Sequence, residues 1–338
     1  MKKVRIGVIC PSEIALRRFM PAVKALDEAE YVGVASATAE EWFGEGQAVD
    51  EAVIEKERAK AQTFVSEYGG TVFKSYIELI TSAEVDAVYI PLPPALHFKW
   101  AKLALENGKH VFLEKPSTVS ARDTKELVEL AERKRLALHE NYMFAFHKQL
   151  EEINEIVSSG KIGDVRLYRI AFGFPQRAKN DFRYSKALGG GALLDCGGYT
   201  LKLATMLLGS SARIVYSQLN YTDDFEVDIY GSAAMVNDES VTAQLSFGMD
   251  NSYKCELEIW GSKGCLSTGR ILTAPVGFVP TADIRIGNET ETVTLSADDT
   301  FAKSILKFCG CVADDDERIN NYKALIKQAE LVDQVKGA

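Results

Sequence analysis

The stretch His110-Val111-Phe112-Leu113-Glu114-Lys115-Pro116 decides how the first part of this chain is organised. Its apolar residues predict a short buried strand, and a glutamate, a lysine and a proline follow at the carboxyl end of that strand. A lysine at this position contributes little to a core. In an open parallel α/β sheet, however, ligands bind outside the carboxyl ends of the strands. The stretch therefore predicts a parallel sheet that presents Lys115 to a ligand.

Strands and helices alternate on both sides of this stretch. Apolar segments predict further strands at Val4–Ile9, Tyr31–Ser36, Thr71–Phe73, Val85–Ile90 and Leu136–Glu140. Repeated strand–helix units predict a parallel sheet with helices on both faces. The helix expected within Glu13–Leu26 contains Pro21, which predicts that this helix starts late, kinks or breaks there. We expect a doubly wound α/β domain over residues 1–140.

The pattern changes after about Phe146. Longer segments in which polar and apolar residues alternate predict strands at Val165–Phe174, Ile214–Tyr221, Val241–Phe247 and Tyr253–Trp260. Such alternation is typical of an antiparallel sheet with one face on the core and the other toward water or a partner. Helices are expected at Lys148–Ser159, Ala192–Leu208 and Glu317–Lys336. Residues 141–338 therefore predict an α+β domain with an open, mostly antiparallel sheet.

Composition argues against several classes of protein. The chain has 338 residues, 46% of them hydrophobic, and a formal net charge of −9, which argues against nucleic acid as a partner because phosphate binding needs a basic face. No apolar run is long enough to cross a bilayer and no signal-peptide core is present, so we expect a cytoplasmic protein without membrane contact. The six cysteines show no metal-binding spacing, and Cys309-Gly310-Cys311 is more simply a pair of buried thiols than a redox or metal fragment.

The turn after the first strand is where a dinucleotide-binding domain carries the pattern G-x-G-x-x-G. Here the three glycine positions hold Cys10, Ser12 and Ala15, with Glu13 and Ile14 between them. The replacements are small, and the helix N-terminus still attracts an anion. Taken alone, this turn favours an α/β domain without a nucleotide over one that binds NADP or NAD.

The end of the second strand bears on the choice between NADP and NAD. An acid at this position binds the ribose 2′-hydroxyl of NAD, whereas residues 34–38 include Ser36 and no acid. A 2′-phosphate is therefore not repelled, and Ser36 can donate a hydrogen bond to it. Arg17 and Arg18 either add positive charge nearby or form a solvated helix face. The pattern favours NADP over NAD.

Residues with unusual chemistry follow the other parallel strands as well. Leu92, Pro93 and His97 come after the fourth strand, and Glu114 closes the fifth. Because the carboxyl ends of parallel strands share one edge, we expect these residues to line a crevice. His97 either contacts the cofactor there or has a structural role. The expected cofactor-binding set is Cys10, Ser12, Glu13, Ile14, Ser36, Leu92, Pro93, His97 and Glu114.

A second set of candidate residues lies in Gly189–Tyr199. Three glycines allow the backbone to pass close to a neighbour, and Asp195 and Tyr199 are four residues apart, which places them on one helix face. With Lys115 they form a set suited to carbonyl reduction. Lys115 would polarise the substrate oxygen, Tyr199 would donate the proton, and Asp195 would hold the lysine and a substrate hydroxyl. Proton donation of this kind is worth about 10²–10⁴-fold in rate, although each residue alone also has a structural explanation.

Together these motifs resemble the Gfo/Idh/MocA family, which includes glucose–fructose oxidoreductase and inositol dehydrogenase. The resemblance rests on Ile90–Pro93, His97, Gly108–Val111, Glu114–Pro116, Glu140–His147 and Gly189–Gly197. It implies a dinucleotide-binding Rossmann domain, NADP or NAD as cofactor, and hydride transfer to or from a sugar-like secondary alcohol or ketone. By motif position it implies Lys115 as the catalytic lysine and Asp195 as a substrate-binding residue, with Tyr199 where many members carry histidine. It also implies a homo-oligomer, a dimer or tetramer, assembled through the C-terminal sheet.

The chain departs from the family pattern in three places. The glycines of the first turn are lost, Ala145 stands where related sequences often carry arginine, and the segment Ala37–Ala61 is unusually long. That segment is either a lid near the adenosine end of the cofactor or a surface excursion with its own packing. These departures keep two other hypotheses open: a non-catalytic nucleotide- or sugar-binding regulator on the same fold, and a subunit whose main role is assembly.

Overall fold

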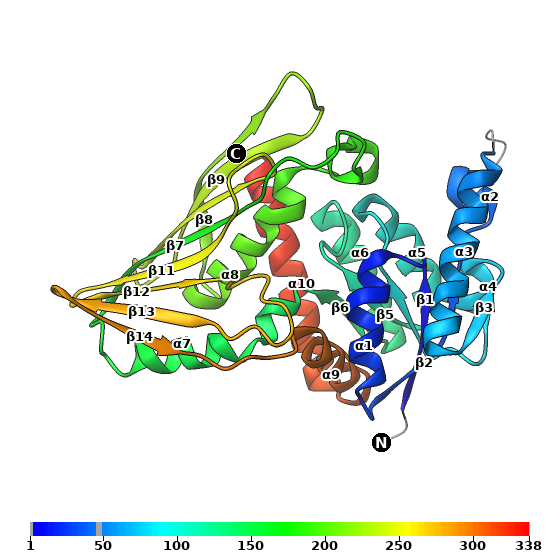
Figure 1. Cartoon of the computed structure of the whole chain (residues 1–338), viewed down its shortest axis with the longest axis horizontal. Helices are drawn as coiled ribbons and strands as arrows, with labels where there is room; N and C mark the ends of the chain where they lie inside the picture. Colours follow the sequence, from blue (N-terminus) through cyan, green and yellow to red (C-terminus); the bar gives the residue numbers. More distant parts are fainter. Residues whose placement is uncertain (1–2, 45–48, 338) are drawn as a thin grey trace. The chain divides into compact units, whose positions relative to one another are not determined.

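The computed structural model describes residues 3–44 and 49–337 of the chain, which form two compact units (Figure 1). The first unit consists of Met1–Thr118, Arg122–Asn141 and Phe301–Ile326. The second consists of Val119–Ala121, Tyr142–Thr300 and Lys327–Ala338. The division expected from the sequence, residues 1–140 and 141–338, does not include the return of residues 301–326 to the first unit.

A six-stranded parallel sheet forms the centre of the first unit, in the order β3-β2-β1-β4-β5-β6. The strands are β1 (Val4–Ile9), β2 (Ala29–Ala35), β3 (Thr71–Phe73), β4 (Ala87–Ile90), β5 (His110–Glu114) and β6 (Leu138–Asn141). This order is that of doubly wound dinucleotide-binding sheets, in which the direction of winding reverses beside the first strand. The predicted parallel α/β fold is confirmed.

Helices pack on both faces of this sheet (Figure 1). They are α1 (Met20–Lys24), α2 (Ala39–Phe43), α3 (Glu51–Tyr68), α4 (Tyr76–Thr81), α5 (Pro94–Glu106), α6 (Ala121–Lys134), α9 (Thr300–Ala313) and the first part of α10 (Asp315–Lys336). The expected helix within Glu13–Leu26 is divided into a π-helical turn, Ala15–Phe19, and the short α1. Pro21 lies just after this π-helical turn, so the helix is irregular where the sequence predicts a late start, a kink or a break, although its backbone stays helical through residues 13–24.

Aromatic packing explains why residues 301–326 belong to the first unit. Phe112 of β5 is fully buried, and its ring packs against Phe19, Tyr89 and His139 at centroid distances of 5.6, 5.4 and 4.9 Å. Phe308 of α9 packs against the same Phe112 ring at 5.4 Å. A helix distant in sequence thus completes the core around β5, the strand that Lys115 follows.

The long segment after β2 has packing of its own. Glu41 and Thr38 form a reciprocal N-terminal cap of α2, and the Glu41 carboxylate also accepts hydrogen bonds from the backbone N–H groups of Tyr76 and Ile77 at the start of α4, both at 3.1 Å. Helix α3 buries four side chains, those of Ile54, Glu57, Ala61 and Phe64. The described part of the segment fits a packed excursion, while residues 45–48, Gly46 among them, lie outside the described residues.

An eight-stranded sheet forms the centre of the second unit, in the order β14-β13-β12-β11-β7-β10-β9-β8. Its strands are β7 (Val165–Gly173), β8 (Arg213–Tyr221), β9 (Asp228–Val236), β10 (Thr242–Gly248), β11 (Lys254–Gly261), β12 (Cys265–Gly269), β13 (Thr281–Ile286) and β14 (Glu289–Thr294). Among the described strand pairs of this sheet, β7 with β10 is parallel and the others are antiparallel, so the predicted mostly antiparallel sheet is confirmed. The sequence pattern does not predict β9 or β12–β14, because these strands are short or rich in small and polar residues.

Helices cover the apolar face of this sheet. They are α7 (Lys148–Ser158), α8 (Gly198–Leu208), which packs on β7 and β10, and the last part of α10 (Figure 1). Short 3₁₀ turns lie at Met143–Phe146, Phe182–Tyr184 and Lys186–Leu188, and a π-helical turn at Leu193–Gly197. Along β11, Leu257 and Ile259 are fully buried, whereas Glu256 and Trp260 point to the opposite face. The second face of the sheet is therefore open and carries both polar and aromatic side chains.

A half-buried histidine of the first unit, His110, predicts that the stability of the fold depends on pH. The Nδ1 atom of His110 accepts a hydrogen bond of 2.9 Å from the backbone N–H of Ala137, which requires an unprotonated nitrogen. Burial, and secondarily the charge of Arg318, lowers the pKa of His110 from 6.5 to about 4. As the pH falls through this window the unfolded chain binds a proton that the folded chain does not, so the free energy of unfolding falls.

We expect the folded protein to lose stability between about pH 6.5 and about pH 4, and His110→Gln to reduce that loss. Glutamine keeps an acceptor for Ala137 but does not titrate. Urea unfolding at several pH values measures the effect. Equal pH dependence in the two proteins would show that His110 does not carry it.

Candidate functional site

Glu114, the last residue of β5, is anchored by two neighbouring strands. Its Oε1 atom accepts hydrogen bonds of 2.7 Å from the hydroxyl of Tyr89 on β4 and from Nδ2 of Asn141 on β6. Removal from water raises the pKa of Glu114, while these hydrogen bonds and the adjacent Lys115 favour its charged form. The backbone that precedes Lys115 is thereby fixed to both neighbouring strands.

The turn after Lys115 is held by two further side chains. The peptide bond between Lys115 and Pro116 is cis, and the Pro116 carbonyl oxygen lies 2.8 Å from Nδ1 of His97 on α5. The next backbone N–H, that of Ser117, donates a 2.7 Å hydrogen bond to Glu140 Oε1 on β6. Residues of α5 and β6 therefore hold the turn on the far side of Lys115.

His97 joins two of the strand ends that the sequence singles out. Its Nε2 atom lies 2.7 Å from the carbonyl oxygen of Leu92, so its two ring nitrogens face the turns after β4 and β5. The side chain is 0% exposed, and burial lowers its pKa. This arrangement supports the structural role that the sequence left open for His97, and its contact with a cofactor stays a prediction.

The turn after β1, where the sequence shows no glycine, keeps a backbone conformation that favours glycine. Cys10 has φ of 73°, in the left-handed region that favours glycine, and its N–H donates to the Ala35 carbonyl oxygen at 3.0 Å. For a residue with a side chain this conformation costs about 1–2 kcal/mol. Ser12 Oγ accepts from the N–H of Ala15 at 3.2 Å and so fixes the start of the helix. Desolvation raises the pKa of the Cys10 thiol to about 12, which keeps it neutral.

The other cofactor candidates differ in exposure. Glu13 is exposed at the start of the helix and pairs with Arg17 at 3.2 Å, next to the exposed Ile14. Ser36, directly after β2, is 3% exposed. Leu92 is buried and Pro93 is half-buried in the turn that precedes α5. All of these residues belong to the first unit, at the carboxyl ends of its strands.

Close backbone approaches explain the three glycines before Asp195. Gly189 has φ of 77°, a Cβ at Gly190 would lie 2.3 Å from the carbonyl oxygen of Arg183, and one at Gly191 would lie 2.4 Å from Oδ1 of Asp228. The other carboxylate oxygen of Asp228 accepts a 2.6 Å hydrogen bond from the N–H of Leu193. The glycines thus allow the chain to enter the helix between two neighbouring segments.

The sequence predicts that Asp195 lies in a regular α-helix, but the structure differs. Asp195 lies in the π-helical turn Leu193–Gly197, and Tyr199 lies in the first turn of α8. A π-helical turn contains more residues than an α-helical one and is frequent at functional sites. Oδ2 of Asp195 accepts a 2.8 Å hydrogen bond from Nε of Arg183, a residue that the sequence pattern does not indicate.

Tyr199 is packed among other aromatic rings of the second unit. Its ring lies 5.2 Å from Tyr142, 5.7 Å from Phe144 and 5.3 Å from Phe172, and its side chain is 7% exposed. The hydroxyl approaches the Met143 sulfur at 3.9 Å. Tyr142 and Phe144 are themselves buried in the core of this unit. The rings fix the direction of the Tyr199 phenol.

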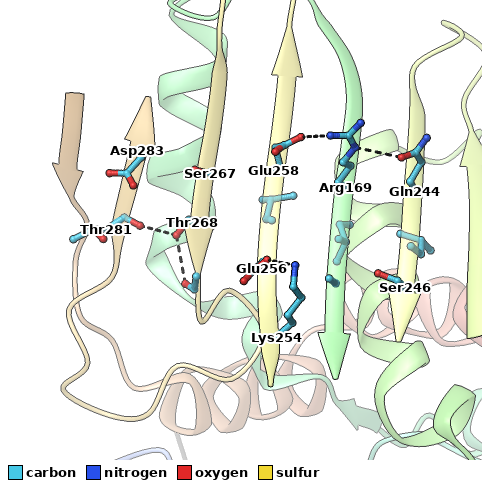
Figure 2. A pocket seen from close by; sticks show the side chains of 15 residues that line it. Arg169, Gln244, Ser246, Lys254, Glu256, Glu258, Ser267, Thr268, Thr281 and Asp283 are labelled. Carbon is cyan, nitrogen blue, oxygen red and sulfur yellow. Dashed lines mark hydrogen bonds and ion pairs between the residues drawn. The ribbon is translucent and has the colours of Figure 1, made fainter. Parts of the chain in front are cut away.

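A separate hollow of about 740 Å³ lies on the open face of the second unit's sheet. Figure 2 shows Arg169 of β7 between Glu258 of β11 and Gln244 of β10, at 2.9 and 3.3 Å. Lys254 pairs with Glu256 at 3.1 Å on the same face. These charges are already paired with one another, which is typical of a surface rather than of a reactive centre.

The candidate residues therefore form two groups, and each group is supported by contacts within its own unit. Lys115 and the cofactor candidates belong to the first unit, and Asp195 and Tyr199 to the second. The convergence of Lys115 and Tyr199 on one substrate atom stays a prediction. Among the helices within residues 3–44 and 49–337, none has the length and apolar character needed to cross a bilayer.

Comparisons with known proteins match nearly the whole chain. Residues 5–142 match the "Oxidoreductase family, NAD-binding Rossmann fold", and residues 150–267 match the "GFO/IDH/MocA C-terminal domain". A dTDP-3,4-didehydro-2,6-dideoxy-α-D-glucose 3-reductase from Streptomyces violaceoruber is 38% identical over 100% of this chain and 96% of its own. A reductase of the same name from Actinomadura kijaniata is 35% identical over 98% of this chain and 95% of its own.

The fold is shared with a solved 3-ketoreductase from Actinomadura kijaniata in complex with NADP and TDP-benzene. The two structures align with a TM-score of 0.90 at 34% identity, over 99% of this chain and 98% of the other. Variants of that enzyme in which one tyrosine is replaced by phenylalanine, or one lysine by alanine or glutamate, have also been solved with the same two ligands.

The contacts of His97 with the carbonyl groups of Leu92 and Pro116 form a clamp on the turns after β4 and β5. We expect the removal of this clamp to lower the free energy of unfolding. His97→Ala removes the N–H that the neutral His97 ring donates to one of the two buried carbonyl groups, those of Leu92 and Pro116, at a cost of about 1–3 kcal/mol. It should also increase amide hydrogen exchange at Ser117, in the turn that His97 holds. Urea unfolding and exchange followed by mass spectrometry measure the two effects.

His97→Gln provides the comparison, because its amide nitrogen donates to one carbonyl and the loss should be smaller. If His97→Ala unfolds at the same urea concentration as the natural protein, with unchanged exchange at Ser117, the clamp does not hold the turn.

Proposed function

This chain belongs to the Gfo/Idh/MocA family of oxidoreductases, and we propose that it reduces the 3-keto group of a dTDP-linked deoxy sugar with NADPH. The chain is an NAD(P)-dependent oxidoreductase that acts on a sugar-like secondary alcohol or ketone. The more specific substrate is proposed because reductases of dTDP-linked 3-keto sugars match almost the full length of the chain.

The spacing of two residues carries the assignment of the catalytic groups. The lysine and the tyrosine replaced in the Actinomadura kijaniata variants are separated by the same number of residues as Lys115 and Tyr199 here. The long segment 37–61 precedes both residues and therefore does not affect their separation. The equal spacing supports Lys115 and Tyr199 as the pair that acts on the substrate oxygen.

The proposed reaction needs a hydride, a proton and a stabilised oxygen. NADPH supplies the hydride to the carbonyl carbon when it is bound. The Lys115 ammonium polarises the carbonyl oxygen and favours the charge that develops on it, and the Tyr199 hydroxyl donates the proton. Asp195 accepts a hydrogen bond from a substrate hydroxyl. A new C–H bond and a new O–H bond form, and the ketone becomes a secondary alcohol.

The first unit fits a dinucleotide in two respects. The Cys10 turn keeps the positive φ of a glycine, so the backbone leaves β1 as it does in a glycine-rich turn. Ser36 follows β2 with no acid in residues 34–38, which favours the 2′-phosphate of NADP over NAD. The cofactor is NADP or NAD, and the preference for NADP is part of this proposal.

The non-catalytic alternative is not favoured. The relatives that match nearly the full length are named as reductases, and the candidate lysine, aspartate and tyrosine are all present. The degraded glycine turn was the reason to consider a regulator. The positive φ of Cys10 weakens that reason, because the backbone adopts a conformation that favours glycine although the glycine is absent.

We also propose that the open face of the second sheet is an interface between copies of this chain. Large side chains are exposed there, with Trp260 at 51%, Tyr216 at 55% and Tyr230 at 44%. The guanidinium of Arg169 lies 5.3 Å from the Trp260 ring. A face with both aromatic anchors and paired charges is typical of protein interfaces.

A cytoplasmic location is also part of the proposal, since the six cysteines are free thiols in the structure.

Replacing the proposed pair should separate turnover from cofactor binding. We expect Tyr199→Phe to lower kcat by about 10²–10⁴-fold and Lys115→Met by a similar factor. NADPH affinity, measured by fluorescence titration, should stay within about threefold if neither group holds the dinucleotide. Turnover is followed by NADPH absorbance with a dTDP-linked 3-keto sugar. Full activity in both variants would contradict the assigned chemistry.

The proposed interface predicts a change of assembly. Trp260→Arg adds a charge to the exposed face, near the end of β11, and should shift the protein from dimer or tetramer toward monomer in sedimentation velocity. Ile77→Arg, on α4, is the matched control because Ile77 is 50% exposed and belongs to the other unit. A natural protein that sediments as a monomer at micromolar concentration would contradict the interface.

A further inference from the structure

Arg183 lies between two carboxylates at the start of the Asp195 segment. Its Nε atom donates to Asp195 Oδ2 at 2.8 Å, and its Nη1 atom donates to both carboxylate oxygens of Asp181 at 3.0 and 3.3 Å. The guanidinium also lies 4.5 Å from the centroid of the Phe182 ring. The side chains of Arg183, Asp181 and Asp195 are 22, 20 and 13% exposed.

The backbone of Arg183 is attached to the same segment. Its carbonyl oxygen accepts a 2.9 Å hydrogen bond from the N–H of Gly191, and Gly190 passes so close that a Cβ there would lie 2.3 Å from this oxygen. Its own N–H donates to Asp181 at 3.0 Å. Main chain and side chain therefore fix Arg183 both to the turn that leads into the π-helix and to the aspartate within it.

The residue after Arg183 anchors this loop to the sheet. The Tyr184 hydroxyl donates to the Met249 carbonyl oxygen at 3.2 Å and accepts from the N–H of Arg177 at 3.0 Å. The Tyr184 ring stacks on Phe225 at 4.4 Å. The guanidinium is thus held on a rigid support, which is what a group that orients another side chain requires.

The charges favour an ordered Asp195 carboxylate. Burial lowers the pKa of Arg183, but Asp195 and Asp181 outweigh it and raise the value above that of free arginine, so the guanidinium stays charged. A planar guanidinium fixes both the distance and the direction of its hydrogen bonds, whereas a lysine ammonium fixes only the distance. One oxygen of Asp195 is therefore held in a defined direction.

We propose that Arg183 is a positioning residue: it holds the Asp195 carboxylate in the direction in which it receives the substrate, and Asp181 in turn holds Arg183. The inference rests on the proposed function in that Asp195 is taken to contact the sugar. Arg183 acts through Asp195. If the ion pair served only to fold the loop, replacing Arg183 and replacing Asp195 would change kcat/KM independently of each other.

A double-mutant cycle tests the inference. We expect Arg183→Gln to lower kcat/KM for the dTDP-linked 3-keto sugar by about 10²-fold, the loss that a misplacement of about 1 Å produces. Arg183→Lys should show a smaller loss, because lysine keeps the positive charge but lacks the directed N–H donors of the planar guanidinium. The double variant Arg183→Gln/Asp195→Asn should be no slower than Asp195→Asn alone, because residues that act as one unit are not additive.

Two controls separate positioning from general damage. Arg213→Gln removes another arginine ion pair of the second unit, with Asp238 at 3.3 Å, and should leave kcat/KM within about twofold. NADPH affinity should also be unchanged in Arg183→Gln. Losses that multiply in the double variant, or an Arg183→Lys variant as slow as Arg183→Gln, would overturn the inference.

The same cycle measured by urea unfolding does not depend on the substrate. One outcome is that the natural protein fails to reduce the dTDP-linked sugar while Arg183 and Asp195 are still coupled in the unfolding midpoint. That result would contradict the proposed function but would leave the interaction between Arg183 and Asp195 established. Normal turnover without coupling in either cycle would contradict the inference and leave the proposed function intact.

Discussion

The turn that presents Lys115 depends on buried hydrogen bonds from neighbouring elements. The side chains that hold it are Tyr89 of β4, His97 of α5, and Glu140 and Asn141 of β6. A lysine side chain is flexible and strongly hydrated, so its position is reproducible only if its backbone is fixed. These bonds fix the backbone on both sides of Lys115. The remaining requirement of the proposed chemistry, an oriented acid and phenol, is supplied in the second unit by a similarly supported segment.

Two segments that hold candidate residues contain a π-helical turn. Ala15–Phe19 follows the turn after β1, and Leu193–Gly197 contains Asp195. In each case the backbone just before the turn is unusual: Cys10 has positive φ, and Gly190 and Gly191 pass within a Cβ's reach of neighbouring atoms. Local strain and π-turns persist where the surrounding packing holds them and occur often at functional sites. The two segments share this feature although they have no common sequence pattern.

The sequence was sufficient for features that depend on local pattern. Apolar runs followed by helices predicted the parallel sheet, and alternation in Tyr253–Trp260 predicted the open antiparallel one. Contacts between distant segments were not predictable, because nothing near Phe308 signals that its ring meets Phe112. The sequence does not indicate Arg183 for the same reason, since its contact with Asp195 arises only when the loop folds back on the glycines. The shape of the Cys10 turn is not predictable from the sequence either, because a cysteine there suggests a lost glycine conformation, whereas the backbone retains it.

The central claim is that Lys115 and Tyr199 act on one oxygen atom of the substrate. A crystal structure of the chain with NADP and a dTDP-linked sugar that carries a hydroxyl in place of the ketone measures this directly. The account predicts that Lys115 Nζ and Tyr199 Oη both lie within hydrogen-bond distance, about 2.6–3.2 Å, of that sugar oxygen, with the nicotinamide ring beside the carbon that carries it. A complex in which either group points away from that oxygen, while the sugar carbon lies against the nicotinamide, would contradict the account.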